Sequence, residues 1–460
     1  MLKFKNNSKH IKKGDIFICT HDIYDDRHKY ISDAIKNGCK AIIIDKDIKP
    51  NNKMFIKVQN TNDTYYQILN NYYNYPLDNL KLVGITGTDG KTTTAMIIND
   101  LLNNYINSSY LGTNGFVLKE KVIKTKNTTP SLDTLFKYFN ILNKNNYNSL
   151  IMEVSSEAML HNRCHNINFD IAILTNINKD HLNIHKTFKN YLDSKTKLFK
   201  QAKLCILNKD DKHFNYIKKR CNKNIITYGT SKKCNYYFYN INEYSDKTTF
   251  NLKVNNKIYN ITSPLLGKFN VYNLVAAIIT LNCFNIDMPS IIDNIKKLKQ
   301  VPGRLQKIDF KQNYDIILDY AHTTNATYEV LNFFNKVKKG NIITVVGCAG
   351  KRYKDKRSEI GKIVTNYSNK VIFTMDDPRN ENVESIISDM TSKVKNNNYE
   401  IIEDRTKAIF KALSLAKEND TLLILGKGLD NYMAIDDKYI KYSDLNVIKS
   451  YFKKLSKEKW

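Results

Sequence analysis

The sequence predicts an α/β protein with three domains: a small α/β domain, a central domain with a mostly parallel sheet, and a C-terminal Rossmann-like domain. The chain has 460 residues, and domains contain roughly 150 residues each. Short apolar runs alternate with helical segments along most of the chain, which is typical of sheets covered by helices on both faces. Two changes of composition, each containing a proline, divide the chain near residues 79 and 301.

The first domain is expected at residues 1–79. Apolar runs at residues 15–19 and 41–45 predict short strands, and residues 31–37 between them predict a helix. A polar segment rich in Tyr and Asn, with Pro76 near its end, closes this domain.

The central domain is expected at residues 80–301. Continuous apolar runs predict buried strands at residues 82–85, 150–153, 171–174 and 204–207, and a helix is predicted at residues 270–280. In residues 235–263, aromatic and polar residues alternate around Asn255 and Asn256, which predicts an antiparallel hairpin insert.

The C-terminal domain is expected at residues 302–460, where Pro302 and Gly303 mark its start. Apolar runs again alternate with helical segments, at residues 315–318, 342–346, 370–373 and 421–425. This alternation predicts a second parallel sheet.

The chain is strongly basic, with 72 Lys and Arg against 45 Asp and Glu and a net charge of +27. Such a charge is typical of proteins that bind nucleic acid. The excess consists mostly of Lys spread among Asn, Ile and Tyr, as an AT-biased genome produces, and forms no concentrated tract. We therefore expect no nucleic-acid partner, and keep a nucleic-acid-binding P-loop ATPase as the alternative from a different class.

The eight cysteines form no C-x-x-C pair, which predicts reduced, mostly buried thiols. No apolar stretch reaches the 18 or so residues of a membrane span, and no apolar signal segment follows the basic residues at the start of the sequence. We expect a cytoplasmic protein with no membrane partner.

A glycine-rich segment at residues 84–93 lies between a predicted strand and a predicted helix, and is the strongest local signal. Its glycines let backbone N–H groups face phosphate oxygens, and the helix start adds positive potential. Lys91 can neutralise phosphate charge, and Thr92 can offer its hydroxyl to Mg²⁺. The predicted ATP-binding residues of this P-loop-like segment are Gly87, Thr88, Asp89, Gly90, Lys91, Thr92 and Thr93.

The spacing departs from the ordinary P-loop because the glycines stand at positions 84, 87 and 90. This variant, G-x-T-G-T-x-G-K-T-T, resembles that of the Mur ligase superfamily, ATP-dependent amide-forming enzymes that include folylpolyglutamate synthetase. Further motifs follow in the family's order. They are Asn127-Thr-Thr-Pro130, Met152-Glu-Val-Ser-Ser156, Asp180-His181-Leu182, Tyr191-Leu-Asp-Ser-Lys195, Leu266-Gly-Lys-Phe-Asn270, Val301-Pro-Gly-Arg304, Asp319-Tyr-Ala-His322, Asp376-Asp-Pro-Arg379 and Gly426-Lys-Gly428.

The ordered set looks most like the MurE type, which adds a diamino acid to UDP-N-acetylmuramoyl-L-alanyl-D-glutamate. The resemblance implies catalytic roles for Lys91, His322 and a Lys195 carbamylated by CO₂. It also implies magnesium ligands at Thr92, Glu153, His181 and Lys195. Glu153 ends a predicted buried strand, where a crevice should open at the sheet edge.

The resemblance also implies contacts with both nucleotide substrates. Further ATP contacts are expected from Asn273, Arg304 and Asp319, and contacts with the UDP-muramoyl dipeptide from Ser8, Thr128, Thr129, Ser155 and Arg163. Two alternatives stay open: Asn273 as a helix cap and His322 as a core histidine.

The amino-acid pocket is expected to contain Arg352, Asp376, Asp377, Arg379, Gly426 and Asp430. The family signature for meso-diaminopimelate is Asp-Asn-Pro-Arg, in which Arg grips the distal carboxylate as a bidentate pair. Here Asp377 replaces the Asn, and Leu429-Asp430 replaces the family's His-Glu. The resemblance therefore favours meso-diaminopimelate, with L-lysine or another diamino acid as the alternative.

The implied function is ATP- and Mg²⁺-dependent ligation in peptidoglycan precursor synthesis, through an acyl phosphate, by a monomeric enzyme. Alternatives within the family are a folylpolyglutamate synthetase-like or another Mur-type ligase. A catalytically dead scaffold is disfavoured because Lys91, Thr92, Glu153 and Lys195 are all present.

Overall fold

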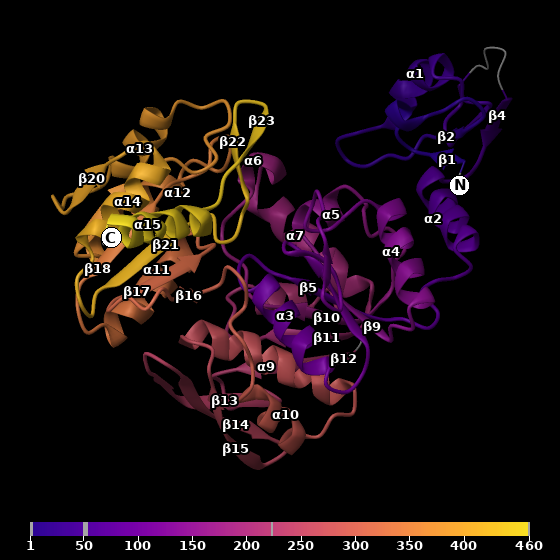
Figure 1. Cartoon of the computed structure of the whole chain (residues 1–460). Helices are drawn as coiled ribbons and strands as arrows, with labels where there is room; N and C mark the ends of the chain where they lie inside the picture. Colours follow the sequence, from indigo (N-terminus) through magenta and orange to yellow (C-terminus); the bar gives the residue numbers. More distant parts are fainter. Residues whose placement is uncertain (1–2, 49–53, 222–223, 459–460) are drawn as a thin grey trace.

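The computed structural model describes residues 3–48, 54–221 and 224–458. Met1 and Leu2, at the basic start of the sequence, lie outside this range. Three α/β units follow one another along the chain, and the first and last lie on opposite sides of the central one (Figure 1). Their main sheets lie within residues 4–57, 81–263 and 306–425. We propose the domain boundaries at residues 79/80 and 301/302, in the connections between these sheets.

The N-terminal unit is the small α/β domain that the sequence predicts. Its four described strands are all parallel and lie in the order β1-β2-β3-β4. The strands are β1 (Phe4–Lys5), β2 (Ile16–Ile18), β3 (Ala41–Ile44) and β4 (Met54–Lys57), and the helices are η1 (Ser8–His10), η2 (Arg27–Tyr30), α1 (Ile31–Lys36) and α2 (Thr61–Tyr72).

The central unit is built on a sheet of eleven described strands in the order β15-β14-β13-β12-β11-β10-β5-β9-β6-β7-β8. The strands are β5 (Lys81–Thr86), β6 (Ser108–Gly112), β7 (Gly115–Leu118), β8 (Lys121–Ile123), β9 (Ser149–Glu153), β10 (Phe169–Leu174), β11 (Ala202–Asn208), β12 (Asn224–Gly229), β13 (Tyr236–Glu243), β14 (Thr248–Val254) and β15 (Lys257–Ser263). The helices are α3 (Lys91–Leu102), α4 (Leu132–Lys144), α5 (Ser156–Leu160), α6 (Leu182–His185), α7 (Phe188–Lys200), α8 (Phe214–Lys218), α9 (Lys268–Cys283) and α10 (Met288–Ile295). From β6 to β13 across β5 the neighbouring strands are parallel, so their carboxyl ends meet at one edge.

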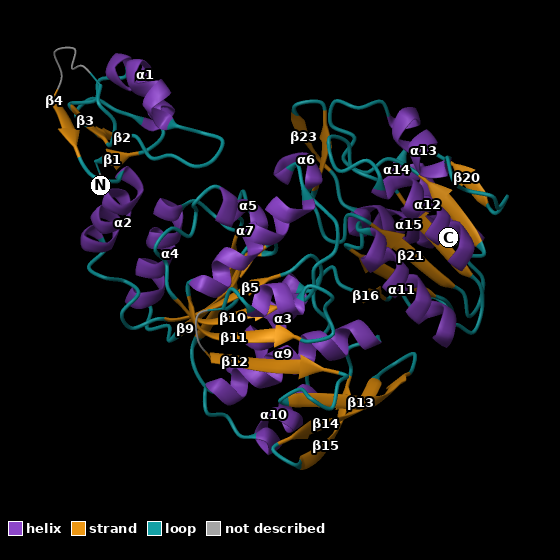
Figure 2. Ribbon diagram, turned by 180° about the vertical axis from the view of Figure 1, so that it is seen from behind, coloured by secondary structure: helices purple, strands orange, loops and turns teal. Residues whose placement is uncertain are grey.

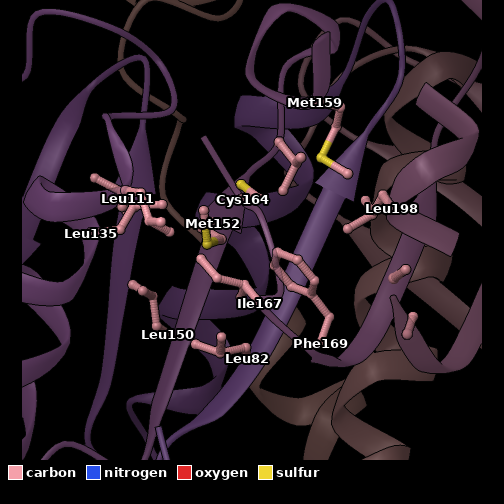
Figure 3. Packing of buried hydrophobic residues seen from close by; sticks show 14 of the residues in the cluster. Leu82, Leu111, Leu135, Leu150, Met152, Met159, Cys164, Ile167, Phe169 and Leu198 are labelled. Atoms are coloured by element: carbon pink, nitrogen blue, oxygen red, sulfur yellow. The ribbon is translucent and has the colours of Figure 1, made fainter. Parts of the chain in front are cut away.

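Strand β5 lies between β10 and β9, and every residue after Lys81 is buried because helices cover both faces of the sheet (Figure 2). On one face Phe169 packs in a cluster that includes Leu82, Met152 and Leu198 (Figure 3). This packing explains the continuous apolar run of the strand.

The predicted hairpin in residues 235–263 is confirmed as the antiparallel strands β13, β14 and β15. Asn255 and Asn256 form its turn between β14 and β15, with φ angles of 47° and 63°, as the twisted turn of a hairpin requires. The hairpin is not a separate insert, however, because β13 pairs with β12 and extends the main sheet.

The C-terminal unit has a mixed sheet in the order β16-β17-β21-β18-β19-β20, and only β16 is antiparallel to its neighbour. The strands are β16 (Gln306–Ile308), β17 (Asp315–Asp319), β18 (Ile342–Val346), β19 (Lys370–Phe373), β20 (Tyr399–Ile401), β21 (Thr421–Leu425) and the separate hairpin β22 (Tyr432–Ile435) and β23 (Lys438–Lys441). The helices are α11 (Thr324–Val337), α12 (Lys356–Tyr367), α13 (Val383–Thr391), α14 (Arg405–Leu415) and α15 (Asp444–Glu458). Two hydrophobic clusters cover the two faces of the sheet, as in the predicted Rossmann-like arrangement.

All eight cysteines lie in the described residues and none is in a disulfide; five are buried and three are half-buried. In the described part of the chain, no helix is both long and apolar enough to cross a membrane.

Candidate active site

One cavity of about 990 Å³ opens where the carboxyl ends of the central strands face the C-terminal domain. The loops after β5, β9 and β10 form its central wall, and the segments after β17, β18, β19 and β21 form the opposite wall. Ligands of open parallel sheets bind at such strand ends. The cavity therefore has the place in the fold that the sequence predicts for the active site.

The phosphate-loop residues line this cavity from Thr88 to Thr93. Gly90 caps helix α3 with a φ of 83°, a conformation that glycine adopts without strain. The Lys91 Nζ atom donates to the carbonyl oxygens of Gly87 at 3.0 Å and Thr88 at 2.9 Å. Enclosure between the domains lowers the pKa of Lys91, while the carboxylates of Glu153 and Asp89 oppose this shift.

Glu153 lies at the end of β9, beside the start of α3. Its Oε1 atom accepts hydrogen bonds from the Thr92 hydroxyl at 2.9 Å, the Tyr110 hydroxyl at 2.6 Å and the Thr113 N–H at 2.9 Å. The Thr92 Oγ1 also accepts from Arg304 at 3.1 Å. Two predicted magnesium ligands are thus in contact, and a carboxylate with a hydroxyl is a donor set that suits Mg²⁺.

Among the described residues, no three His, Cys, Asp or Glu side chains are grouped to hold a metal by themselves. Mg²⁺ commonly binds through one or two carboxylates together with substrate phosphates and waters. The Glu153 and Thr92 pair, at the edge of a cavity lined by a phosphate loop, fits that mode of binding.

Lys195 is buried behind the phosphate loop and does not line the cavity. Its Nζ atom donates to the Gly87 carbonyl at 2.6 Å and lies 4.7 Å from the centre of the Tyr191 ring. Burial, together with the nearby Lys91 ammonium, holds the pKa of Lys195 well below its ordinary value. The ammonium of the unmodified Lys195 is thus bonded to the loop backbone, and its role as a carbamylated metal ligand stays a prediction.

The other predicted ligand, His181, does line the cavity. Its Nδ1 is 3.4 Å from Glu157 and its Nε2 is 3.5 Å from Asp180. The ring stacks on Tyr191 with 6.3 Å between centroids, so Tyr191 contacts both His181 and Lys195.

Asn273 lies inside α9, so the alternative of a helix cap is wrong. Its Oδ1 accepts from Thr94 at 3.1 Å, and its Nδ2 donates to Asn270 at 3.0 Å. The bond from Thr94 joins α3 to α9, and Asn273 lies on the cavity wall beside Gly90.

Three more predicted residues come from the C-terminal side. Asp319 accepts the backbone N–H groups of Leu305 and Ala321 at 2.7 and 2.6 Å, and burial raises its pKa. The Arg304 guanidinium lies 4.6 Å from the centre of the Tyr320 ring. His322 is exposed where it lines the cavity, so the alternative of a core histidine is wrong.

Direct contacts join the central and C-terminal domains around this cavity. The Thr323 hydroxyl donates to Asp89 Oδ1 at 2.9 Å. The Lys356 Nζ is 3.8 Å from Asp180, and both side chains are only 8% exposed. Both contacts join a cavity-lining loop of the central domain to the C-terminal domain.

All six predicted amino-acid-pocket residues line the same cavity: Arg352, Asp376, Asp377, Arg379, Gly426 and Asp430. Among them, Arg379 donates to the Gly350 carbonyl at 2.5 Å. The two arginines and the three carboxylates place both signs of charge on this part of the cavity wall.

The predicted contacts of the UDP substrate divide into two groups. Thr128, Ser155 and Arg163 line the cavity, whereas Thr129 and Ser8 do not. The buried Thr129 hydroxyl instead donates to the Glu153 carbonyl at 2.8 Å, and Ser8 is buried within η1. Internal packing encloses both side chains, and their contact with the substrate stays a prediction.

A second cavity, of about 290 Å³, lies between the N-terminal and central domains. Its walls include Asn6, Thr20 and His21 from the first domain and His161 from the second. Arg163 lines both cavities, so its side chain marks the place where they approach each other.

Lys427 belongs to the Gly426-Lys-Gly428 motif but had no predicted role. It does not line the cavity itself. Its side chain is fully buried, and its Nζ is 2.8 Å from Asp377, 3.8 Å from Asp376 and 3.7 Å from Asp430, which do line the cavity. Burial opposes the charge of Lys427, but the surrounding carboxylates raise its pKa overall. A lysine between glycines directly after a buried strand is the sequence signal that could have identified it.

Comparisons with known proteins agree with this geometry. Residues 85–281 match the Mur ligase middle domain, and residues 303–428 match the family described as Mur ligase, glutamate ligase domain. A Clostridium botulinum protein named UDP-N-acetylmuramoyl-L-alanyl-D-glutamate--2,6-diaminopimelate ligase is 34% identical over 460 residues, covering 98% of this chain and 95% of the relative. The Clostridium tetani protein of the same name is 35% identical over 458 residues, covering 98% and 94%.

Solved structures of Mur ligases resemble the fold of this chain. A structure of a ligase with that name has a TM-score of 0.70 and 27% identity, covering 99% of this chain and 95% of the other. The MurF ligase of Thermotoga maritima in complex with ADP shares the fold, with a TM-score of 0.64 at 20% identity, and coverage of 99% and 98%. The chain therefore belongs to the Mur ligase family.

Proposed function

We propose that this Mur ligase joins a diamino acid, meso-diaminopimelate in the first place, to UDP-N-acetylmuramoyl-L-alanyl-D-glutamate with ATP as the energy source. One observation carries the proposal: a single cavity brings together a phosphate loop, the Glu153–Thr92 pair and a pocket with two arginines and three aspartates. The names of the relatives, which are 34–35% identical along nearly the whole chain, support the same substrates.

The proposed reaction has two steps. A carboxylate oxygen of the UDP-linked substrate attacks the γ-phosphorus of ATP, which gives an acyl phosphate and releases ADP. The amine of the incoming amino acid then attacks the acyl carbon, forms the amide bond, loses a proton and releases phosphate. Positioning and electrostatic stabilisation supply most of the catalysis in such phosphoryl transfers.

The proposed role of each residue follows from its position in the cavity. Lys91, Arg304 and the N–H groups at the start of α3 lie where they can hold phosphate oxygens. Glu153, Thr92 and His181 are the proposed contacts for Mg²⁺, which would supply further neutralisation of phosphate charge. Enclosure by the C-terminal domain keeps water away from the acyl phosphate, and His322 faces the reacting groups from that side.

Lys195 suits the proposed carbamylation in one respect. An amine must be neutral to react with CO₂, and burial holds the pKa of Lys195 well below its ordinary value. We propose that the carbamate turns away from the Gly87 carbonyl and presents its oxygens toward the metal contacts. Ligation is then expected to fall in CO₂-depleted buffer and to recover with bicarbonate.

Arg352 and Arg379 are the proposed contacts for the distal carboxylate of meso-diaminopimelate. L-Lysine lacks that carboxylate, and remains the second candidate because Asp430 is shorter than the family's Glu. We also propose a monomer that acts in the cytoplasm with neither nucleic acid nor membrane as a partner.

The test offers the enzyme ATP, Mg²⁺ and UDP-N-acetylmuramoyl-L-alanyl-D-glutamate together with meso-diaminopimelate, L-lysine or no amino acid. Phosphate release and product mass are measured in parallel. A diaminopimelate adduct is the expected result, and a lysine adduct would instead assign the second candidate. If neither adduct forms, the proposed ligation is wrong.

A further inference from the structure

Tyr320 lies between the nucleotide side and the amino-acid side of the cavity and contacts both. Its hydroxyl donates to Asp430 Oδ1 at 2.5 Å, and its ring lies under the Arg304 guanidinium at 4.6 Å. Arg304 in turn donates to Thr92 of the phosphate loop. A chain of contacts thus leads from the phosphate loop to the amino-acid pocket through the side chains of Arg304 and Tyr320.

The Tyr320 ring has little freedom to move. Its own N–H donates to the Gly303 carbonyl at 3.2 Å. A Cβ atom added at Gly428 would lie 2.2 Å from the ring, and one added at Gly303 would lie 2.8 Å from it. The backbone at both positions therefore lies so close to the ring that no residue with a Cβ atom would fit there. This close packing fixes the position of the hydroxyl.

The three carboxylates of the pocket differ in how many of their oxygens already accept hydrogen bonds from the protein. Asp377 Oδ1 accepts from Lys427 at 2.8 Å and from the Ala434 N–H at 3.0 Å. Asp376 is 3.8 Å from the same ammonium, and a Cβ at Gly426 would lie 2.4 Å from its Oδ2.

Asp430 is the carboxylate of the three that remains most accessible. Its side chain is 25% exposed, against 8% for Asp376 and 11% for Asp377. One of its oxygens is held by Tyr320, and the other lies 3.7 Å from Lys427, beyond hydrogen-bond distance.

We propose that Tyr320 is a positioning residue for amino-acid specificity: its hydroxyl holds Asp430 so that the second carboxylate oxygen binds the distal ammonium of the diamino acid. The assignment rests on the proposed function. Hydrogen bonds between an ammonium and a carboxylate are stronger than neutral ones, so the geometry of this oxygen controls the preference for a diamino acid.

The test uses Tyr320→Phe, which removes the hydroxyl and keeps the ring under Arg304. Each diamino acid is compared with its analogue lacking the distal amine: meso-diaminopimelate with 2-aminopimelate, and L-lysine with 2-aminohexanoate. The variant is expected to raise KM for the accepted diamino acid on the order of tenfold. The KM for ATP, the value of kcat and turnover of the amine-free analogue should change by less than about twofold, so the preference for the diamino acid falls about tenfold.

Tyr314→Phe is the matched control, since it makes the same change in the same domain outside the cavity. The Tyr314 hydroxyl donates to the Leu413 carbonyl at 3.4 Å. Its kinetics with all four amino acids should match those of the unchanged enzyme.

Asp430→Asn completes the experiment. If Tyr320 acts through Asp430, the double variant loses no more preference than Asp430→Asn alone. The role of Tyr320 would be overturned if Tyr320→Phe weakened the reaction with the diamino acid and with its analogue equally. It would also be overturned if the losses of preference from the two substitutions added in the double variant. If the unchanged enzyme ligates no diamino acid, the proposed function itself fails, and that result is distinct from either loss.

Discussion

Individual side chains in this protein owe their chemistry to the loops that hold them. Lys91 is the clearest case, because its ammonium is bound by two carbonyls of its own loop and lies near Glu153 and Asp89. The loop itself thus fixes the position of the ammonium beside the cavity, where we expect it to meet a phosphate group.

Replacement of Lys91 by Ala should lower ligation by a factor on the order of 10²–10³, the cost of losing one group that stabilises developing charge. The fold should persist, because the hydrogen bonds of the Lys91 ammonium to the described chain go to two loop carbonyls. Phosphate release and circular dichroism measure the two effects, and the exposed Lys189→Ala serves as the control. Substantial ligation by the Ala variant would refute the phosphate-loop assignment.

The buried cysteines should resist alkylation in the native protein. Burial raises the pKa of Cys19 and Cys164 to about 12, and that of Cys348 to about 11, above an ordinary value of about 8.5. Only the thiolate reacts, so at pH 8 these thiols should react more than about 100-fold slower in the native than in the urea-unfolded protein. Iodoacetamide labelling followed by peptide mass analysis checks this, and equal rates in both states would contradict it.

Lys91 could be predicted from the sequence and Tyr320 could not. Lys91 belongs to a local motif, in which a strand, three glycines and a helix start specify the geometry within ten residues. Tyr320 acquires its role from Asp430, which is 110 residues away. The same limit applies to Thr129 and Ser8, whose enclosure depends on packing that no local pattern records.

At the scale of elements, helices α14 and α15 are joined by a fully buried ion pair. Arg405 donates to both carboxylate oxygens of Asp444 at 2.8 Å, and also to the Leu425 carbonyl at 2.9 Å. Neither charged side chain is exposed. Since Leu425 directly precedes Gly426, this pair also supports the strand end that carries the amino-acid pocket.

Asp444→Asn should destabilise the C-terminal domain by roughly 3–5 kcal/mol, because it leaves the buried Arg405 charge without its partner. Urea unfolding followed by circular dichroism measures the change. The exposed pair Lys393–Glu359, with side chains 57% and 44% exposed, is the control, and Glu359→Gln should cost less than about 1 kcal/mol. Similar costs for both variants would show that burial of the Arg405–Asp444 pair does not matter.

The types of these elements were largely predictable. The continuous apolar run of β5 is typical of a strand buried on both faces, and the alternation in β13–β15 is typical of strands with one exposed face. How the elements join was not predictable, because the pairing of β12 with β13 involves only Tyr228–Tyr236 and Gly229–Tyr237. Such edge pairing depends on where a strand lies in the finished fold rather than on its own pattern.

Over the whole molecule, the active cavity exists only where the central and C-terminal domains meet. The contact between Lys356 and Asp180 crosses this boundary with both side chains nearly buried. Closure of domains around a reactive intermediate excludes water from it. We therefore expect the boundary contacts to influence catalysis as well as stability.

Lys356→Met keeps the apolar stem but removes the charge, so it should loosen the boundary and let water reach the acyl phosphate. The expected result is a rise in phosphate released per ligated product, with ligation falling about tenfold or more. Phosphate and adduct are quantified in the same reaction. Lys354→Met, two residues away and 64% exposed, should keep the ratio near one, and an unchanged ratio in both variants would contradict this role.

Arg163 lines both cavities, so the length of a substrate decides whether it can occupy both of them. A substrate that occupies both cavities must extend from the N-terminal domain to the phosphate loop, past this single guanidinium. A shorter acid could reach the chemistry but would leave the outer cavity vacant and forfeit its binding energy. We therefore expect binding energy from the outer cavity to favour a long substrate over small carboxylic acids.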